Sequence, residues 1–192
     1  MAGFQYCIFD LDGTLVDSLP GIAWSIDSAF AECGLSTPAC NVGQLIGPPI
    51  RQILAHIAGT SNTAFLDRLE HSFRRSYDSE GWRKTTCFNG VIDLLRELQA
   101  AGVEVFLVTN KPAHVTRRIL DELNLTGFFR DVACRGSQSS KAEVLAALLA
   151  RWGLDPRTGL MVGDTQEDSA AADASGMACR IVNPTQCEVF TI

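Results

Sequence analysis

The chain has 192 residues, 46% of them hydrophobic, so it can bury one full core and carry a smaller inserted segment. Its formal net charge of -6 argues against nucleic acid as a partner, because nucleic-acid-binding proteins usually present a basic face. No apolar run approaches the ~20 residues that a membrane span needs, and the first residues lack the basic start of a signal peptide.

The seven cysteines are widely spaced and include no CxxC pair. This pattern favours buried thiols in a reducing compartment over a disulfide framework or a zinc site. We therefore expect a cytoplasmic protein that binds neither nucleic acid nor a membrane.

Five short apolar segments predict β-strands, and several of them are apolar on both faces, as in sheets covered on each side. In chain order they span residues 4–10, 103–109, 131–134, 159–163 and 179–183. Apolar stripes with a helical period lie between the later segments. This alternation predicts an α/β fold with a doubly wound, Rossmann-like parallel sheet of about five strands.

Residues from about 17 to 84 interrupt the alternation. Helical periods at residues 20–33, 49–58 and 63–78 are separated by turn-forming residues. A helical block inserted after the first strand predicts a second domain. We expect a catalytic α/β core of residues 1–16 and 85–192, and a helical cap of residues 17–84.

Charged and polar residues follow the predicted strands at their carboxyl ends, where parallel α/β sheets bind ligands. They are Asp10 and Asp12 at the end of the first strand, Thr109 and Asn110 at the end of the second, Asp164 and Asp168 after the fourth, and Lys141 at the start of the helix before the fourth. We expect all of them to converge on one crevice.

The residue types in this set predict chemistry on a phosphate ester. Clustered carboxylates repel one another unless a cation neutralises them, and a few hard oxygen ligands suit Mg²⁺. Asp10 and Asp12 alternate with Leu11, so on an extended backbone their side chains point the same way. One carboxylate can attack phosphorus and form an aspartyl phosphate, while the other exchanges protons with the leaving oxygen and with water. The Thr109 hydroxyl and the Lys141 charge suit phosphate oxygens.

Each motif alone also has a structural explanation. The sequence DLDGT could be a turn, and Asp residues in GDTQED could favour a helix N-terminus electrostatically. Thr109 and Asn110 could cap a helix that has Pro112 in its first turn. The joint placement of the motifs at successive strand ends favours a functional site.

The chain resembles the haloacid dehalogenase superfamily of phosphohydrolases, and within it the phosphoglycolate phosphatase-like branch with a helical cap. FDLDGTLVDS (residues 9–18) matches the first family motif, LVTNKP the second, Lys141 the third and MVGDTQED the fourth. Relatives often carry Lys-Pro at the third motif, whereas this chain has SSKAEV and keeps the basic group.

The resemblance implies roles for the acidic residues. Asp10 would be the phosphoryl-accepting nucleophile and a Mg²⁺ ligand. Asp12 would be the general acid/base and would bind Mg²⁺ through its backbone carbonyl. Asp164 would bind Mg²⁺, and Asp168 would support that site directly or through water.

The resemblance also implies how the substrate would be held. Thr109 and Asn110 would hold the phosphoryl group, and Lys141 would neutralise its charge. The segment from Gly47 to Arg51 resembles the cap loop that faces the active site in relatives. Arg51 could therefore contact the leaving group of the substrate, although a solvent-exposed arginine is the alternative.

These observations predict a Mg²⁺-dependent phosphatase that hydrolyses a small phosphorylated metabolite, with a phosphoglycolate-like ester as one candidate. Two alternatives stay open. A sugar-phosphate mutase would use the same residues but return the phosphoryl group to a sugar. A non-catalytic phosphometabolite-binding protein could also be built on this fold, because a fold alone does not establish activity.

Overall fold

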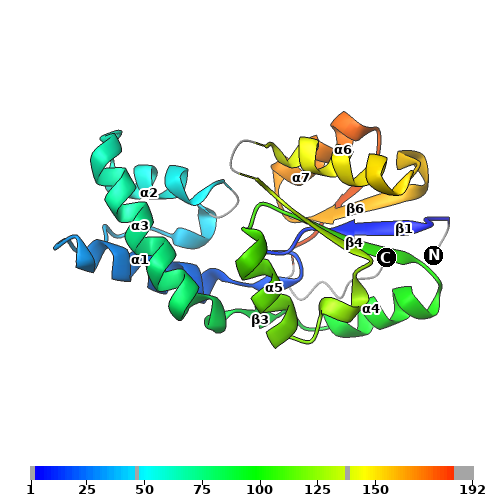
Figure 1. Cartoon of the computed structure of the whole chain (residues 1–192), viewed down its shortest axis with the longest axis horizontal. Helices are drawn as coiled ribbons and strands as arrows, with labels where there is room; N and C mark the ends of the chain where they lie inside the picture. The colour runs from blue at the N-terminus through cyan, green and yellow to red at the C-terminus, as the bar shows by residue number, and fades with distance from the viewer. Residues whose placement is uncertain (1–2, 46–47, 137–138, 184–192) are drawn as a thin grey trace. The chain divides into compact units, whose positions relative to one another are not determined.

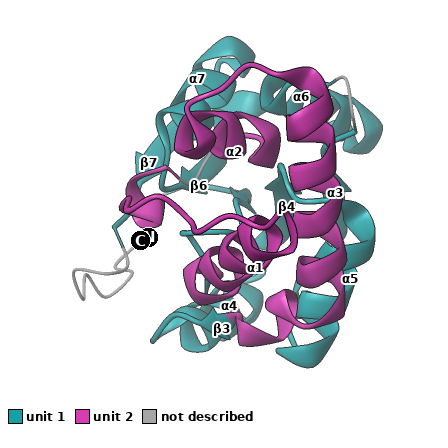
Figure 2. Cartoon of the chain, turned by 90° about the vertical axis from the view of Figure 1, so that its left-hand side faces the viewer, with its two compact units in different colours: residues 1–17, 86–192 teal, residues 18–85 magenta. Residues whose placement is uncertain are grey.

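The computed structural model of the protein describes residues 3–45, 48–136 and 139–183. The chain divides into two compact units (Figure 2). The first joins Met1–Asp17 to Thr86–Ile192, and the second is Ser18–Thr85. These bounds differ by one residue from those expected from the sequence. A role of the second unit as a cap stays a prediction.

The first unit contains a sheet of five parallel strands in the order β5-β4-β1-β6-β7 (Figure 1). The strands are β1 (Tyr6–Phe9), β4 (Glu104–Thr109), β5 (Asp131–Cys134), β6 (Gly159–Gly163) and β7 (Ala178–Ile181). The helices of this unit are α4 (Val91–Ala100), α5 (Ala113–Glu122), α6 (Lys141–Trp152) and α7 (Gln166–Ser175). Short 3-10 turns, η3 (Thr126–Phe128) and η4 (Pro156–Thr158), precede β5 and β6. The prediction of an α/β fold with a Rossmann-like parallel sheet is confirmed.

Helices cover both faces of this sheet because successive side chains of each strand point to opposite faces. Tyr6 and Ile8 share a buried apolar cluster with α6 and α7. Cys7 and Phe9 belong to a second cluster with residues of α4 and α5. Figure 1 shows the two helix pairs on opposite sides of the strands. Full burial of one such large side chain contributes ~1.5–3 kcal/mol relative to exposure. These two cores fix the strand ends that carry the candidate site.

Two very short strands, β2 (Val16–Asp17) and β3 (Thr86–Cys87), pair in antiparallel fashion. They lie where the chain leaves the first unit and where it returns. The sequence analysis did not predict them, because two residues are too few to show a strand period.

The second unit is helical, as its sequence period predicts. Its helices are α1 (Leu19–Glu32), α2 (Ile50–Ala58) and α3 (Thr63–Ser79), with 3-10 turns η1 (Val42–Gln44) and η2 (Gly81–Lys84). A Cβ atom on Gly21 of α1 would collide with the backbone carbonyl of Gly81, so this helix and η2 approach closely only because residue 21 is glycine. In the described part of the chain, we find no helix that is both long and apolar enough to cross a bilayer.

Candidate active site

The loop after β1 is a compact turn that places Asp10 at the end of the buried strand. The Leu11 carbonyl accepts hydrogen bonds from the amides of Leu15 at 2.9 Å and Val16 at 3.1 Å. Gly13 adopts a φ of +80°, which glycine reaches without strain, and a Cβ atom there would collide with the Asp164 carboxylate. The turn therefore brings the first motif against the loop that follows β6. Asp10 is only 5% exposed there.

The start of α7 fixes two further carboxylates. Asp164 directly follows β6, and its Oδ1 accepts a hydrogen bond of 3.0 Å from the Thr14 hydroxyl. Asp168 is fully buried, and its Oδ2 accepts hydrogen bonds from the Thr165 amide at 3.0 Å and the Thr165 hydroxyl at 2.6 Å. The Asp168 amide donates back to the Thr165 hydroxyl at 3.4 Å, which makes a reciprocal cap on α7.

A second reciprocal cap positions Lys141. The Ser140 side chain accepts a bond from the Glu143 amide, and the Glu143 carboxylate accepts one of 2.7 Å from the Ser140 amide. Helix α6 therefore begins at Lys141, with Ser140 as its N-cap residue. The Lys141 Nζ lies 2.7 Å from Asp10 Oδ1 and 2.5 Å from Asp168 Oδ1.

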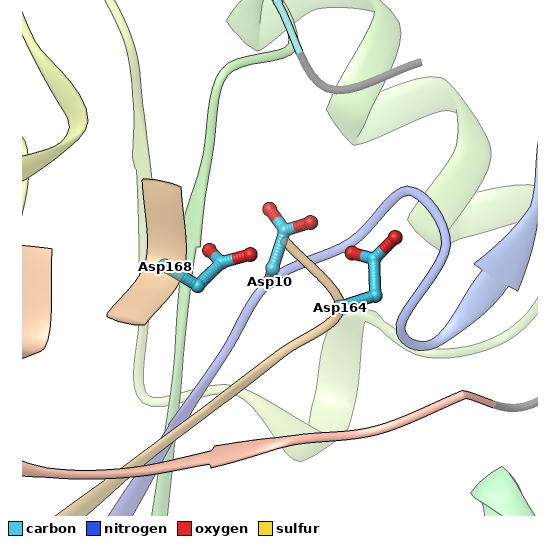
Figure 3. A group of neighbouring side chains, drawn as sticks. All are labelled: Asp10, Asp164 and Asp168. Carbon is cyan, nitrogen blue, oxygen red and sulfur yellow. The ribbon is translucent and has the colours of Figure 1, made fainter. Parts of the chain in front are cut away.

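Figure 3 shows Asp10 between Asp164 and Asp168, with the three carboxyl groups close together. Each offers an oxygen within 4.8 Å of the others. Burial raises the pKa of Asp10 to about 7, although the Lys141 charge opposes this shift. Burial likewise raises the pKa of Asp164 to about 6, against the hydrogen bond from Thr14. Burial lowers the pKa of Lys141, but Asp10 and Asp168 outweigh it and the net shift is upward.

Asp12 occupies a different electrostatic environment from Asp10. Its Oδ2 forms an ion pair of 3.0 Å with Lys111 Nζ, and both side chains are largely buried. Its Oδ1 is buried and has no hydrogen-bond partner within the described residues. The two carboxylates of the first motif therefore engage different lysines, and the Asp12 carboxylate lies outside the group of three formed by Asp10, Asp164 and Asp168.

Thr109 is the last residue of β4, and Asn110 follows it at the same edge of the sheet. The buried Thr109 hydroxyl accepts a hydrogen bond of 3.2 Å from the Lys111 amide. The Asn110 side-chain amide donates to Glu167 Oε2 at 2.8 Å. Helix α5 begins at Ala113, with Pro112 at its N-cap position and no side-chain cap. The alternative explanation of these two residues as a helix cap is therefore wrong.

Arg51 lies in the second unit, at the start of α2. Its Nη1 forms ion pairs with Asp67 at 2.7 Å and Glu70 at 3.0 Å, both on α3. Its side chain is 38% exposed. Gly47, the start of the segment that suggested a substrate contact, lies outside the described residues. The contact between Arg51 and a leaving group stays a prediction.

Four side chains at this edge had no role assigned from the sequence: Thr14, Lys111, Arg135 and Glu167. Thr14 and Lys111 lie inside the first two motifs, so their position was a usable signal. Arg135 directly follows the predicted third strand, and Glu167 lies in GDTQED. Only their tertiary contacts with Asn110 reveal that the last two belong together.

Comparison with known proteins shows the family to which the chain belongs. A family model described as haloacid dehalogenase-like hydrolase matches residues 7–182. The phosphoglycolate phosphatase of Pseudomonas syringae pv. tomato is 36% identical over 182 residues, which cover 90% of this chain and 66% of the relative. The tyrosine-protein kinase PtkA of Mycobacterium tuberculosis is 34% identical over 182 residues, which cover 93% of this chain and 62% of the relative.

A solved structure shows the same architecture. A haloacid dehalogenase-like family hydrolase from Streptococcus pneumoniae superposes with a TM-score of 0.84 at 26% identity, covering 93% of this chain and 84% of that one. The chain spans less than two thirds of the length of the curated relatives described above, at 62% and 66%. These matches confirm the resemblance that the four sequence motifs indicated.

Proposed function

Since the chain belongs to the haloacid dehalogenase-like hydrolase family, we propose that it is a Mg²⁺-dependent phosphatase that hydrolyses a small phosphorylated metabolite. The observation that carries this proposal is the group formed by buried Asp10 and Asp168 and half-buried Asp164, with Lys141 paired to the two buried carboxylates. A phosphoglycolate-like ester is the first candidate substrate, because a relative with 36% identity is named phosphoglycolate phosphatase. We also propose that the protein is cytoplasmic, because its widely spaced cysteines favour a reducing compartment.

The donor set fits a hard divalent cation. Three neighbouring carboxylates, two of them buried and paired with the ammonium group of Lys141, leave two negative charges without a counter-charge when all four groups are ionised. Asp10 and Asp164, with the backbone carbonyl of Asp12, would hold Mg²⁺, which would supply the missing positive charge next to the phosphate. Asp168 already binds Lys141 and Thr165, which supports a role in holding the site together.

In the first step, an Asp10 carboxylate oxygen attacks phosphorus and forms an aspartyl phosphate. The bond between phosphorus and the ester oxygen breaks, and the leaving oxygen takes a proton from Asp12. For this role, the Asp12 carboxylate must be held in position and still have an oxygen that can gain or lose a proton. Its ion pair with Lys111 holds one oxygen, and the other lacks a hydrogen-bond partner in the described part of the chain.

In the second step, Asp12 takes a proton from water, and the resulting hydroxide attacks the phosphorus of the aspartyl phosphate. The bond between phosphorus and the Asp10 oxygen breaks, which releases inorganic phosphate and restores both carboxyl groups. Thr109 can donate its hydroxyl proton to a phosphoryl oxygen, because that hydroxyl accepts its other hydrogen bond from the Lys111 amide. Lys141 stabilises the charge that spreads over the phosphoryl oxygens.

The experiment is phosphate release from a panel of small phosphate esters, with and without Mg²⁺. We expect release that depends on Mg²⁺ and that Asp10→Asn abolishes, a loss of about 10³-fold or more for a missing nucleophile. Asp173→Asn, which removes an equal charge at an exposed position of α7, is the matched control and should keep its activity. Circular dichroism checks that each variant is folded.

Other outcomes would identify the alternatives. An isomerised sugar phosphate without free phosphate would indicate a mutase. Transfer from ATP to a tyrosine peptide would indicate the activity that the name of the mycobacterial relative describes. Tight binding of an ester without turnover would indicate a binding protein. Full turnover by Asp10→Asn would show that Asp10 is not the nucleophile.

A further inference from the structure

Three loops at the carboxyl edge of the sheet meet in a small polar network. The Asn110 side-chain amide donates to Glu167 Oε2 at 2.8 Å. The Arg135 guanidinium donates from Nη1 to Asn110 Oδ1 at 3.4 Å, and the same nitrogen lies 3.7 Å from Glu167 Oε1. Asn110 follows β4, Arg135 follows β5, and Glu167 is in the first turn of α7. Residues far apart in sequence thus hold one amide group.

This network fixes which end of the Asn110 amide faces which neighbour. The nitrogen faces a carboxylate, which only accepts hydrogen bonds, and the oxygen faces a guanidinium, which only donates. A reversed amide would place oxygen against carboxylate and nitrogen against guanidinium, so two attractive contacts would become repulsive. Because both neighbours are charged, the hydrogen bonds in the observed orientation are stronger than bonds to neutral partners would be.

The backbone holds the same three loops together. The Arg135 amide donates to the Thr109 carbonyl at 2.8 Å, so Arg135 is tied to the residue that directly precedes Asn110. Glu167 directly precedes Asp168, whose buried carboxylate is bound by Thr165 and Lys141. The Arg135 and Glu167 side chains are 23% and 36% exposed, so both are partly shielded from water. Arg135 and Glu167 are therefore both linked through the backbone to residues of the candidate site.

We propose that Glu167 and Arg135 are positioning residues that hold the Asn110 amide in the orientation used to bind the phosphoryl group of the substrate. This inference rests on the proposed phosphatase function and on Asn110 as its phosphoryl contact. Glu167 and Arg135 act through Asn110 and need no substrate contact of their own. Their effect on turnover should therefore vanish when the Asn110 side chain is removed.

The first test reads the amide directly. In the metal-free ¹⁵N-labelled protein, the side-chain NH₂ signals of Asn110 are identified by their loss in Asn110→Ala. Glu167→Ala should move these signals toward the positions of a water-exposed amide, and Glu167→Gln, which keeps an acceptor oxygen, should move them less. Asp173→Asn removes an equal charge from the same helix and should leave them in place. Unmoved Asn110 signals in Glu167→Ala would overturn the proposal.

The second test is a double-mutant cycle on kcat/KM with Mg²⁺ and the best ester. We expect Glu167→Ala to lower kcat/KM about tenfold, as for a charge-assisted hydrogen bond, and Glu167→Gln to recover part of the loss. In the Asn110→Ala background the same change should have little further effect. Arg135→Met should show the same dependence on Asn110.

The cycle separates positioning from a general electrostatic effect. If Glu167 acted only through its charge near the site, Glu167→Ala would have the same effect with and without the Asn110 side chain, and the proposal would be wrong. A wild-type protein that releases no phosphate from any ester would overturn the proposed function and with it the role in phosphoryl binding. The NMR signals would then show whether the network is a structural anchor only.

Discussion

The three carboxylates at the carboxyl edge of the sheet have different partners, and those partners determine what each carboxylate can do. Asp168 is bound by Thr165 and Lys141, so it stabilises the start of α7 and places the lysine. Asp10 shares that lysine, yet burial keeps its pKa near 7. Asp164 is held by the Thr14 hydroxyl and keeps a raised pKa of about 6. A cation bound beside Asp10 and Asp164 would favour their charged forms and so oppose both shifts.

This difference predicts how pH changes the effect of Mg²⁺ on stability. Because the folded-state pKa values of Asp10 and Asp164 are raised, the metal-free folded protein holds more protons than the unfolded chain between about pH 4 and 7. These two groups therefore lower stability as pH rises through that window, and a cation must replace their protons. We expect Mg²⁺ to raise Tm more at pH 8 than at pH 5, measured by scanning calorimetry at matched ionic strength.

The control for this prediction is Asp164→Asn, which removes one of the two titrating groups. Its Mg²⁺-dependent rise in Tm should be smaller, with less difference between the two pH values. An equal rise at pH 5 and pH 8 in the wild-type protein would contradict the assignment of these carboxyl groups to the cation site.

Asp12 carries a separate prediction, because its carboxylate is paired with Lys111 and stands outside the group of three. Asp12→Asn keeps the size of the side chain and an acceptor oxygen for Lys111. We expect turnover to fall by ~10²–10⁴-fold, the usual loss for a general acid/base. With an aryl phosphate, whose leaving oxygen needs no proton, the aspartyl phosphate should still form and should accumulate, which rapid-quench mass spectrometry can measure. A fall of less than about threefold would deny Asp12 this role.

At the scale of the element, the apolar runs predicted each of the five parallel strands to within a few residues. The signal is continuous in β1, β4 and β6, whose residues are buried on both faces. The candidate site was predictable to the same extent, since Asp10, Thr109 and Asp164 stand where such runs end. The partners of these residues were not predictable. Thr14 and Asp164 are 150 positions apart, and Asn110 and Glu167 are 57 apart, so only the folded topology joins them.

The close approach of α1 and η2 gives a prediction about packing. Gly21→Ala should gain ~1 kcal/mol in helix propensity. The new methyl group must, however, displace the backbone carbonyl of Gly81, and overpacking of this kind costs ~1–3 kcal/mol. We expect a net loss of about 1 kcal/mol in the free energy of unfolding, measured by urea denaturation followed by circular dichroism.

The matched control is Gly127→Ala in η3. Within the described part of the chain, a Cβ atom there meets no heavy atom within 4 Å, and its φ is not in the left-handed region. This variant should change the free energy of unfolding little. A Gly21→Ala variant as stable as the wild-type protein would show that α1 and η2 can separate without cost.

At the scale of the whole molecule, most residues that the proposed function uses lie in the first of the two units. The first unit contains the three carboxylates of Asp10, Asp164 and Asp168. It also contains Lys141 and the pair Thr109 and Asn110 at the end of β4. The second unit contains Arg51, which is bound to Asp67 and Glu70 within that unit. If the second unit serves as a cap, it has no part in the bond-breaking chemistry, and its contribution is to the choice of ester and the exclusion of water.

Arg51 gives the test of that division. Arg51→Ala should lower kcat/KM for the best anionic substrate by about ten- to a hundredfold, as for one charge-assisted hydrogen bond, and should lower it much less for a generic aryl phosphate. Arg74→Ala is the matched control, because Arg74 also pairs with Glu70, at 2.6 Å, and its loss weakens the same network. The ion pairs of both arginines are partly exposed, so we expect their loss to cost the unit little stability. If Arg74→Ala changes the preference as much as Arg51→Ala, the effect comes from the α2–α3 ion pairs, and Arg51 has no direct role in specificity.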